Sequence, residues 1–145
     1  MRVLVVYDSQ TGNTEKMAEA IGEGAREAGA DVVVAKVDIV SINYFYSAEV
    51  LFVGSPCYFG NVSWKIKRLF DQGPNLVGEF KGKPAGYFAS SGTKRDGEYT
   101  LYFLRRFLEI HQMRILPGIL SVGAPDEEIL EKCRQYGLQV SQIEL

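Results

Sequence analysis

The chain has 145 residues, a formal net charge of −2, 46% hydrophobic residues and 23% charged residues. This length predicts a single domain spanning residues 1–145, and the weak charge excludes the basic field of a nucleic-acid-binding protein. No apolar run approaches the roughly 20 residues of a membrane helix, and the first predicted strand starts at residue 2, too early for a signal peptide. We therefore expect a cytoplasmic protein with no membrane insertion.

Short apolar runs alternate with helical patterns along the whole chain. The strand candidates, in chain order, are residues 2–7, 31–37, 49–54, 84–90 and 113–121. The helix candidates that follow them are residues 14–28, 41–47, 63–72, 97–111 and 125–140. Two of these helices have readable end signals, because Gly29 follows the first and Pro125 opens the last.

The alternation predicts an α/β fold. Strands that are apolar on both faces are typical of a parallel sheet covered by helices on both sides. Five strands and five helices suit a doubly wound sheet of order 2-1-3-4-5, in which ligands bind at the carboxyl ends of strands 1 and 3. The loops at 8–14, 55–62 and 91–98 should converge at this edge, and each contains glycine with hydroxyl or amide residues.

The loop Ser9-Gln10-Thr11-Gly12-Asn13-Thr14 joins the first strand to the first helix and contains no lysine or arginine. Backbone N–H groups, hydroxyls and the positive end of the helix can hold a phosphate there without a cation. The Gly-Lys-Ser/Thr ending of a nucleoside-triphosphate loop is absent, as are the three glycines of a dinucleotide site. This leaves a phosphate monoester, or the bland alternative of a polar turn capped by Asn13 or Thr14. Asp8 would repel a phosphate, so we expect it to point away.

The same loop resembles the FMN phosphate loop of the flavodoxin family. The block Gly54-Ser55-Pro56-Cys57-Tyr58-Phe59-Gly60-Asn61-Val62-Ser63 is similar to NAD(P)H:quinone oxidoreductases related to the tryptophan-repressor-binding protein. Ser90-Ser91-Gly92-Thr93 resembles the same branch. The resemblance covers nearly the whole chain, and it implies a flavodoxin-like three-layer sandwich, an FMN cofactor and a role in electron transport as a flavoprotein oxidoreductase.

The resemblance also implies roles for individual residues. Ser9, Thr11, Asn13 and Thr14, with the N–H groups of Gln10 and Gly12, would bind the FMN phosphate. Pro56, Cys57, Tyr58, Phe59, Gly60 and Asn61 would line one side of the isoalloxazine ring. Ser90, Ser91, Gly92 and Thr93 would meet the ribityl chain and the pyrimidine edge. Only one of Tyr58 and Phe59 should touch the flavin, because consecutive residues leaving a strand point in opposite directions.

Two functions compete within this family. A segment that closes the site after the fifth strand in the quinone-reductase branch is missing here, and Ile110-His111 keeps at most one of that branch's two histidines. These departures favour an electron carrier with a redox partner protein. The 55–63 loop, the weak net charge and Lys94 with Arg95 favour the alternative, an enzyme that uses NAD(P)H and quinone. We lean to the carrier and assign no catalytic residue and no metal.

The remaining signals concern surfaces and thiols. Trp64 lies about 200° around its helix from Ile66 and so faces away from the buried stripe. Three roles are open for it: covering the flavin edge, forming a subunit interface, or being an ordinary, partly buried tryptophan. The helix 97–111 has a broad apolar face, which predicts a homo-oligomer. Cys57 and Cys133 lie far apart in sequence, which is typical of reduced thiols in an intracellular protein.

Overall fold

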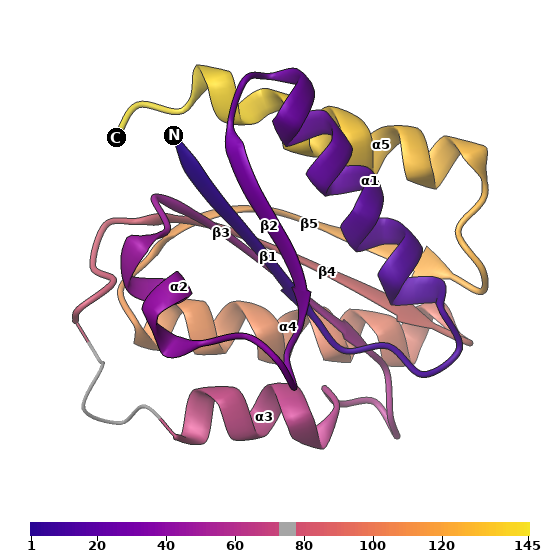
Figure 1. The fold of residues 1–145 in the computed structure, drawn as a ribbon. Coiled ribbons are helices and arrows are strands. Elements are labelled where there is room, and N and C mark those ends of the chain that lie inside the picture. The colour runs from indigo at the N-terminus through magenta and orange to yellow at the C-terminus, as the bar shows by residue number, and fades with distance from the viewer. Residues whose placement is uncertain (73–77) are drawn as a thin grey trace.

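The computed structural model describes residues 1–72 and 78–145. The strands are β1 (Arg2–Tyr7), β2 (Asp31–Lys36), β3 (Val50–Pro56), β4 (Pro84–Ser91) and β5 (Arg114–Val122). The helices are α1 (Asn13–Glu27), α2 (Ile42–Ser47), α3 (Trp64–Asp71), α4 (Lys94–Ile110) and α5 (Glu127–Leu138), followed by the 3₁₀ turn η2 (Gln139–Gln142). The strands form one parallel sheet of order β2-β1-β3-β4-β5, which confirms the predicted fold class (Figure 1).

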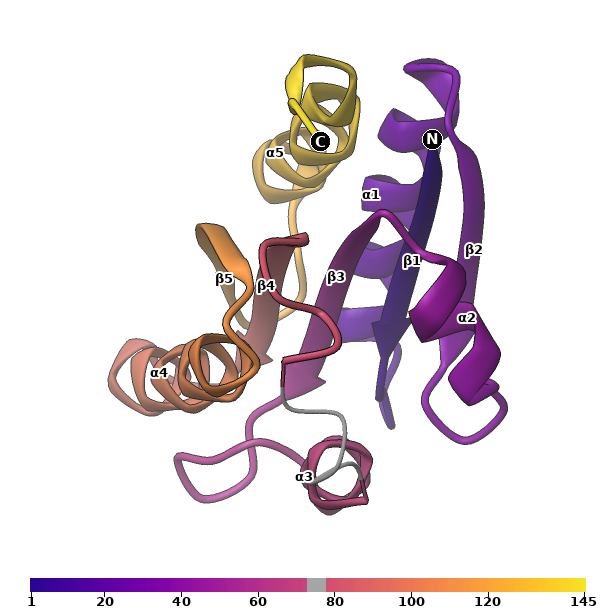
Figure 2. The ribbon, with the colours of Figure 1, turned by 90° about the vertical axis from the view of Figure 1, so that its left-hand side faces the viewer.

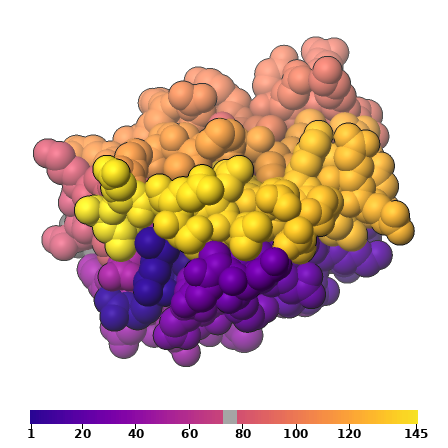
Figure 3. All heavy atoms as spheres, turned by 90° about the horizontal axis from the view of Figure 1, so that it is seen from above, coloured from indigo at the N-terminus to yellow at the C-terminus, as the bar shows by residue number. Residues whose placement is uncertain are grey.

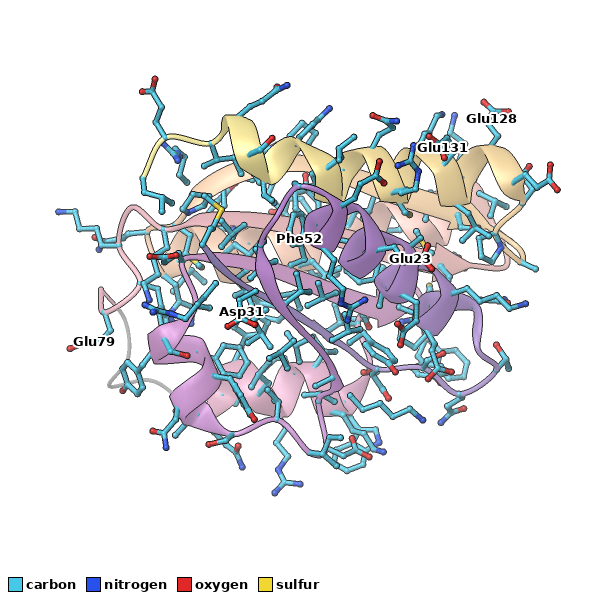
Figure 4. All side chains as sticks on the ribbon, turned by 45° about the horizontal axis from the view of Figure 1, so that its top comes forward. Glu23, Asp31, Phe52, Glu79, Glu128 and Glu131 are labelled. Atoms are coloured by element: carbon cyan, nitrogen blue, oxygen red, sulfur yellow. The ribbon has the colours of Figure 1, made fainter. Side chains whose placement is uncertain are left out.

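The sheet separates two helical layers. Helices α1 and α5 cover one face, and α2, α3 and α4 lie on the other (Figure 2). Side chains alternate between the two cores with the period of 2 expected for a strand: Leu4 and Val6 of β1 pack toward α2, α3 and α4, whereas Val5 packs toward α1 and α5. Phe52, labelled in Figure 4, belongs to the second core and meets the ring of Tyr136 edge to face at 4.9 Å.

Helices α1 and α5 cross at backbone contact and lie side by side on the surface (Figure 3). A Cβ placed at Gly24 would lie 1.8 Å from the carbonyl oxygen of Arg134, and one at Gly137 would lie 1.9 Å from that of Ile21. Only glycine fits at both positions. The crossing fixes α1 against the sheet, and with it the loop that precedes α1.

The predicted helices are all present, with differences at their starts. Helix α4 begins three residues earlier than predicted, because the Thr93 hydroxyl accepts the N–H of Asp96 at 3.3 Å and caps the helix there. Helix α5 begins at Glu127, because Asp126 caps it by accepting the N–H of Ile129 at 2.9 Å. Pro125 therefore precedes the cap, and its predicted place as the opening residue was wrong. Gly29 has a φ of 89° after α1, as its role as an end signal requires.

Within residues 1–72 and 78–145, no helix combines the length and apolar character needed to cross a membrane.

Candidate functional site

The loops after β1, β3 and β4 meet at the carboxyl edge of the sheet around a pocket of about 230 Å³. The pocket is lined by Ser9, Gln10, Thr11, Asn13, Thr14, Pro56, Cys57, Tyr58, Ser90, Ser91, Gly92 and Gly123. All of these except Gly123 belong to the set predicted from the sequence. The order of the sheet brings the three loops together, because β1 and β3 are neighbours whose outgoing connections lead to opposite faces.

The N-terminus of α1 is open toward this pocket. Its cap residue, Gly12, has a φ of 94° and no side chain with which to cap the helix. The other four α-helices of residues 1–72 and 78–145 are each capped by their own N-cap side chain, from Ser41, Ser63, Thr93 and Asp126. No protein acceptor in the described ranges takes the backbone N–H groups of Gln10, Thr11, Asn13 or Thr14. Free donors at the positive end of a helix dipole form a binding site for an anion.

The hydroxyl groups of the first loop serve two purposes. The Ser9 hydroxyl accepts the N–H of Gly12 at 3.1 Å and that of Glu15 at 3.4 Å, which holds the shape of the loop. The Thr14 and Ser90 hydroxyls share a buried hydrogen bond of 2.7 Å, which joins this loop to β4. The Thr11 hydroxyl has no protein partner among the residues that the structure describes, so it is available to a ligand.

The second loop makes a tight turn beside the pocket. Tyr58 and Asn61 exchange two backbone hydrogen bonds of 2.9 and 3.0 Å, so Phe59 and Gly60 form a two-residue turn. Both have positive φ, 51° and 74°, as a type I′ turn requires. The Phe59 side chain is fully exposed at the tip. Tyr58 lines the pocket and Phe59 does not, so Tyr58 is the better candidate for a flavin neighbour.

Five predicted residues lie outside the lining: Gly12, Phe59, Gly60, Asn61 and Thr93. Gly12 and Thr93 are the N-cap residues of α1 and α4, and Asn61 closes the turn. The pocket also contains one residue that sequence reasoning missed. The N–H of Gly123 donates to the carbonyl of Ser91 at 2.7 Å, which brings the connection after β5 to the same edge. The signal was a glycine directly after the fifth strand.

Charged side chains stay outside the pocket. No lysine or arginine of the described ranges lines it. Asp8 is buried, and its carboxylate accepts the N–H of Ser9 at 2.9 Å without entering the lining. Burial and the nearby Asp8 carboxylate raise the pKa of the Tyr58 phenol, which keeps it neutral at physiological pH. Lys94 and Arg95 open α4 at the surface, where the Lys94 Nζ lies 3.9 Å from Glu98.

The aromatic surfaces noted in the sequence are only partly exposed. Trp64 is 63% exposed while Ile66 is fully buried, which confirms that Trp64 faces away from the core. Trp64 does not line the pocket. The apolar breadth of α4 is partly used by α3, since Phe107 stacks on Phe70 with ring centroids 4.8 Å apart. Tyr99 and Tyr102 remain about half exposed. A homo-oligomer remains a prediction.

Comparisons with known proteins agree with this architecture. The family model described as flavodoxin matches residues 5–135. The chain is 50% identical to a flavodoxin of Aquifex aeolicus, over 97% of this chain and 85% of that protein. It is 32% identical to an NAD(P)H dehydrogenase (quinone) of Archaeoglobus fulgidus, over 98% and 96% of the two chains.

Solved structures named as flavodoxins share this fold. A flavodoxin from the domain Archaea superposes with a TM-score of 0.86 at 29% identity, covering 98% of this chain and 97% of that one. A flavodoxin, WrbA-like protein from Agrobacterium tumefaciens gives a TM-score of 0.82 at 27% identity, covering 97% and 95%. The relatives thus include proteins of both functional classes.

Proposed function

This chain belongs to the flavodoxin family, and on that premise we propose that it carries electrons on an FMN held at the carboxyl edge of its sheet. The observation that carries the proposal is the open N-terminus of α1 beside a pocket without cations. When bound, the flavin supplies the redox chemistry, and the protein supplies its position and electrostatic environment.

The donor set fits a phosphate monoester. Four backbone N–H groups and the Thr11 hydroxyl face a volume that no protein acceptor in the described ranges fills. The Thr14–Ser90 hydrogen bond fixes the loop before a ligand arrives, so less ordering entropy is lost on binding. These groups would hold the phosphate, while Ser9 shapes the loop around it.

The other two loops would hold the rest of the cofactor. Pro56, Cys57 and Tyr58 after β3 and Ser90 to Gly92 at the end of β4 form adjoining parts of the pocket lining, since Pro56 pairs with Ser90. The Cys57 N–H donates to the Ser90 carbonyl at 2.9 Å, which ties the two parts together. A flat ring would lie against Tyr58, with the ribityl chain along Ser90 to Gly92.

An electron carrier is the primary function within this proposal. Helix α5 begins five residues after β5 ends, so the site has no closing segment at that point. An open flavin edge suits exchange of electrons with a redox partner protein. The alternative, an NAD(P)H-dependent quinone oxidoreductase, is supported by the 55–63 loop and by the 32% identity to the Archaeoglobus fulgidus protein.

One experiment separates the two functions. The FMN-loaded protein is mixed with NADH or NADPH without oxygen, and the flavin absorbance is followed; a parallel sample is titrated with dithionite. For a carrier we expect no bleaching by either nucleotide and two resolved one-electron steps in the titration. Rapid bleaching, with turnover after benzoquinone is added, would show that the protein is an NAD(P)H-dependent quinone oxidoreductase and not an electron carrier. Failure to retain FMN at all would overturn both.

A further inference from the structure

We propose that the cavity between α2 and α3 is a second binding site, for a small flat apolar molecule that carries one anionic group. Its volume is about 460 Å³, within the range of about 300–1,000 Å³ typical of small-molecule clefts. It shares no lining residue with the pocket proposed for FMN. The two sites can therefore be tested independently.

The cavity lies on the side of α3 that faces away from its aromatic contact with α4. Phe70 of α3 stacks on Phe107 of α4, and the Lys67 Nζ lies 6.0 Å from the same ring. On the other side of α3, the helix α2 has only six residues and buries only Phe45 among those described. Both helices lie on the same face of the sheet (Figures 1 and 2). The short α2 does not fill the space that α3 leaves beside it.

About half of the lining of this cavity is apolar, and the rest comes from Asp38, Lys65, Arg68 and Gln72. Val37 and Val40 of the β2–α2 connection, Phe45 of α2 and Leu69 of α3 contribute to the lining. Ile42 and Trp64 also line it, and they are 47% and 63% exposed. These exposed side chains can contact an apolar ligand that enters the cavity. Trp64 thus lines this cavity and not the pocket proposed for FMN, although covering the flavin edge was one of the roles expected for it.

Of the two cationic side chains that line the cavity, Lys65 has an ion-pair partner and Arg68 has none within the described ranges. The Lys65 Nζ lies 2.8 Å from Asp38 Oδ2, and this hydrogen bond raises the pKa of Lys65. The side chain of Arg68, one turn from Trp64, makes no ion pair or hydrogen bond with any residue of 1–72 or 78–145. A guanidinium next to apolar surface matches a planar carboxylate, sulfonate or phosphate on an aromatic body. A neutral apolar ligand would make no use of Arg68.

The test uses anilinonaphthalene sulfonate as an aromatic anion and N-phenylnaphthylamine as its neutral counterpart. Excess FMN is present throughout, so that the flavin pocket is filled. Trp64 is the only tryptophan in the chain, and its emission reports on this cavity directly. We expect saturable binding of the sulfonate at one site per chain with quenching of Trp64, and weaker binding of the neutral probe.

Two variants and one control sharpen the test. Arg68→Gln should weaken sulfonate binding by about tenfold or more and leave the neutral probe unaffected, because it removes a charge-assisted hydrogen bond. Ile42→Asp should weaken both probes by placing a charge at the apolar wall, and the sulfonate more strongly. Lys67→Gln removes a charge from the opposite side of α3 and should change neither. All three should keep wild-type affinity for FMN.

Three results would overturn the proposal. One is sulfonate binding that does not saturate. Another is equal binding to the wild type, Arg68→Gln and Ile42→Asp. The third is release of FMN as the sulfonate is added, seen as a rise in free-flavin fluorescence, which would place the probe in the flavin pocket. A protein that fails to bind FMN would refute the proposed function but leave this test intact.

Discussion

The hydroxyl residues of the loop before α1 differ in what their hydrogen bonds do. The Ser9 hydroxyl bonds within the loop and to the first turn of α1, and the Thr14 hydroxyl bonds to Ser90 of β4, so both hydroxyls preserve the shape of the loop 9–14. Thr11 has no partner within the described ranges and faces the pocket. Two hydroxyls, those of Ser9 and Thr14, thus hold the loop 9–14 in shape, and the hydroxyl of Thr11 is available to a ligand.

Thr11→Val should therefore weaken only the part of the flavin affinity that comes from the phosphate. Loss of a hydrogen bond to a charged group costs about 1.5–3 kcal/mol, so FMN affinity should fall roughly 10- to 100-fold. Riboflavin, which lacks the phosphate, should bind the variant and the wild type equally. Titrations that follow quenching of flavin fluorescence measure both constants. An equal loss for FMN and riboflavin would show that Thr11 supports the loop rather than the phosphate.

Lys94 and Arg95 carry a prediction about redox potential. Both lie at the start of α4, next to the loop proposed to meet the pyrimidine edge. A cation there stabilises the reduced anionic flavin, but both side chains are exposed and screened. Such exposed interactions are worth about 0.2–1 kcal/mol, which corresponds to roughly 10–40 mV for one electron.

The double variant Lys94→Ala/Arg95→Ala should lower the potential of the second one-electron step by an amount of that order. Lys81→Ala is the control, because Lys81 precedes β4 at the opposite edge of the sheet. Spectroelectrochemical titration measures all three proteins. If the double variant and the control give the same potential as the wild type, the two cations do not act on the flavin.

At the scale of the elements, the contact between α1 and α5 is the tightest constraint on the site. Ordinarily, replacing glycine by alanine inside a helix stabilises it by about 0.8–1 kcal/mol. Here the added carbon would overlap a backbone carbonyl of the facing helix. We expect Gly24→Ala and Gly137→Ala to destabilise the fold by about 1–3 kcal/mol or more, since overpacking forces the helices apart.

Urea unfolding of the FMN-free protein measures this effect. Glu23→Ala, at an exposed position on α1, is the matched control and should not lose stability (Figure 4). Because the crossing holds the loop before α1, both glycine variants should also bind FMN more weakly. A gain in stability in either variant would contradict the close crossing.

An ion-pair cluster across the same crossing predicts a pH dependence. Arg134 of α5 pairs with Glu131 at 2.7 Å and also reaches Glu27 of α1. Hydrogen bonds from Arg134 and Gln135 lower the pKa of Glu131 to about 2, from 4.5. A lowered folded-state pKa contributes stability above the unfolded value, and this contribution is lost as the pH falls toward the folded value.

The stability difference between the wild type and Glu131→Gln should therefore be constant above about pH 5.5 and disappear as the pH falls toward 2. We expect it to be small, because the side chains are exposed. Glu128→Gln is the control. Glu128 projects from the same helix (Figure 4), and its one ion pair within the described ranges is a 3.8 Å contact with Lys132. Urea unfolding at several pH values tests it. A difference that persists unchanged at pH 2 would exclude a contribution from the Glu131 charge.

The elements and the first loop could be predicted because their signals are local. Apolar periodicity predicted the five strands and five α-helices seen in residues 1–72 and 78–145, and the hydroxyl and amide residues of the loop 9–14 suggested phosphate binding. Features that depend on distant contacts could not be predicted. The exposure of Phe59 depends on a turn closed by Tyr58 and Asn61. The place of Gly123 depends on the pairing of β4 with β5.

At the scale of the whole molecule, sheet order alone placed three loops at one edge. The cavity beside Trp64 did not follow from any sequence pattern, because it depends on how α2, α3 and α4 pack against one another. The protein thus has a predictable pocket at the edge of the sheet and a second hollow between helices. For the first of these we predict that the uncapped N-terminus of α1 and its loop recognise a phosphate without a cation.

The most direct measurement compares the dissociation constants of FMN and riboflavin for the wild-type protein under one buffer condition. Several charge-assisted hydrogen bonds to the phosphate, each worth about 1.5–3 kcal/mol, predict that FMN binds at least about 100-fold more tightly. Equal affinities for the two flavins would show that the loop from Ser9 to Thr14 does not bind the phosphate, and would contradict the account.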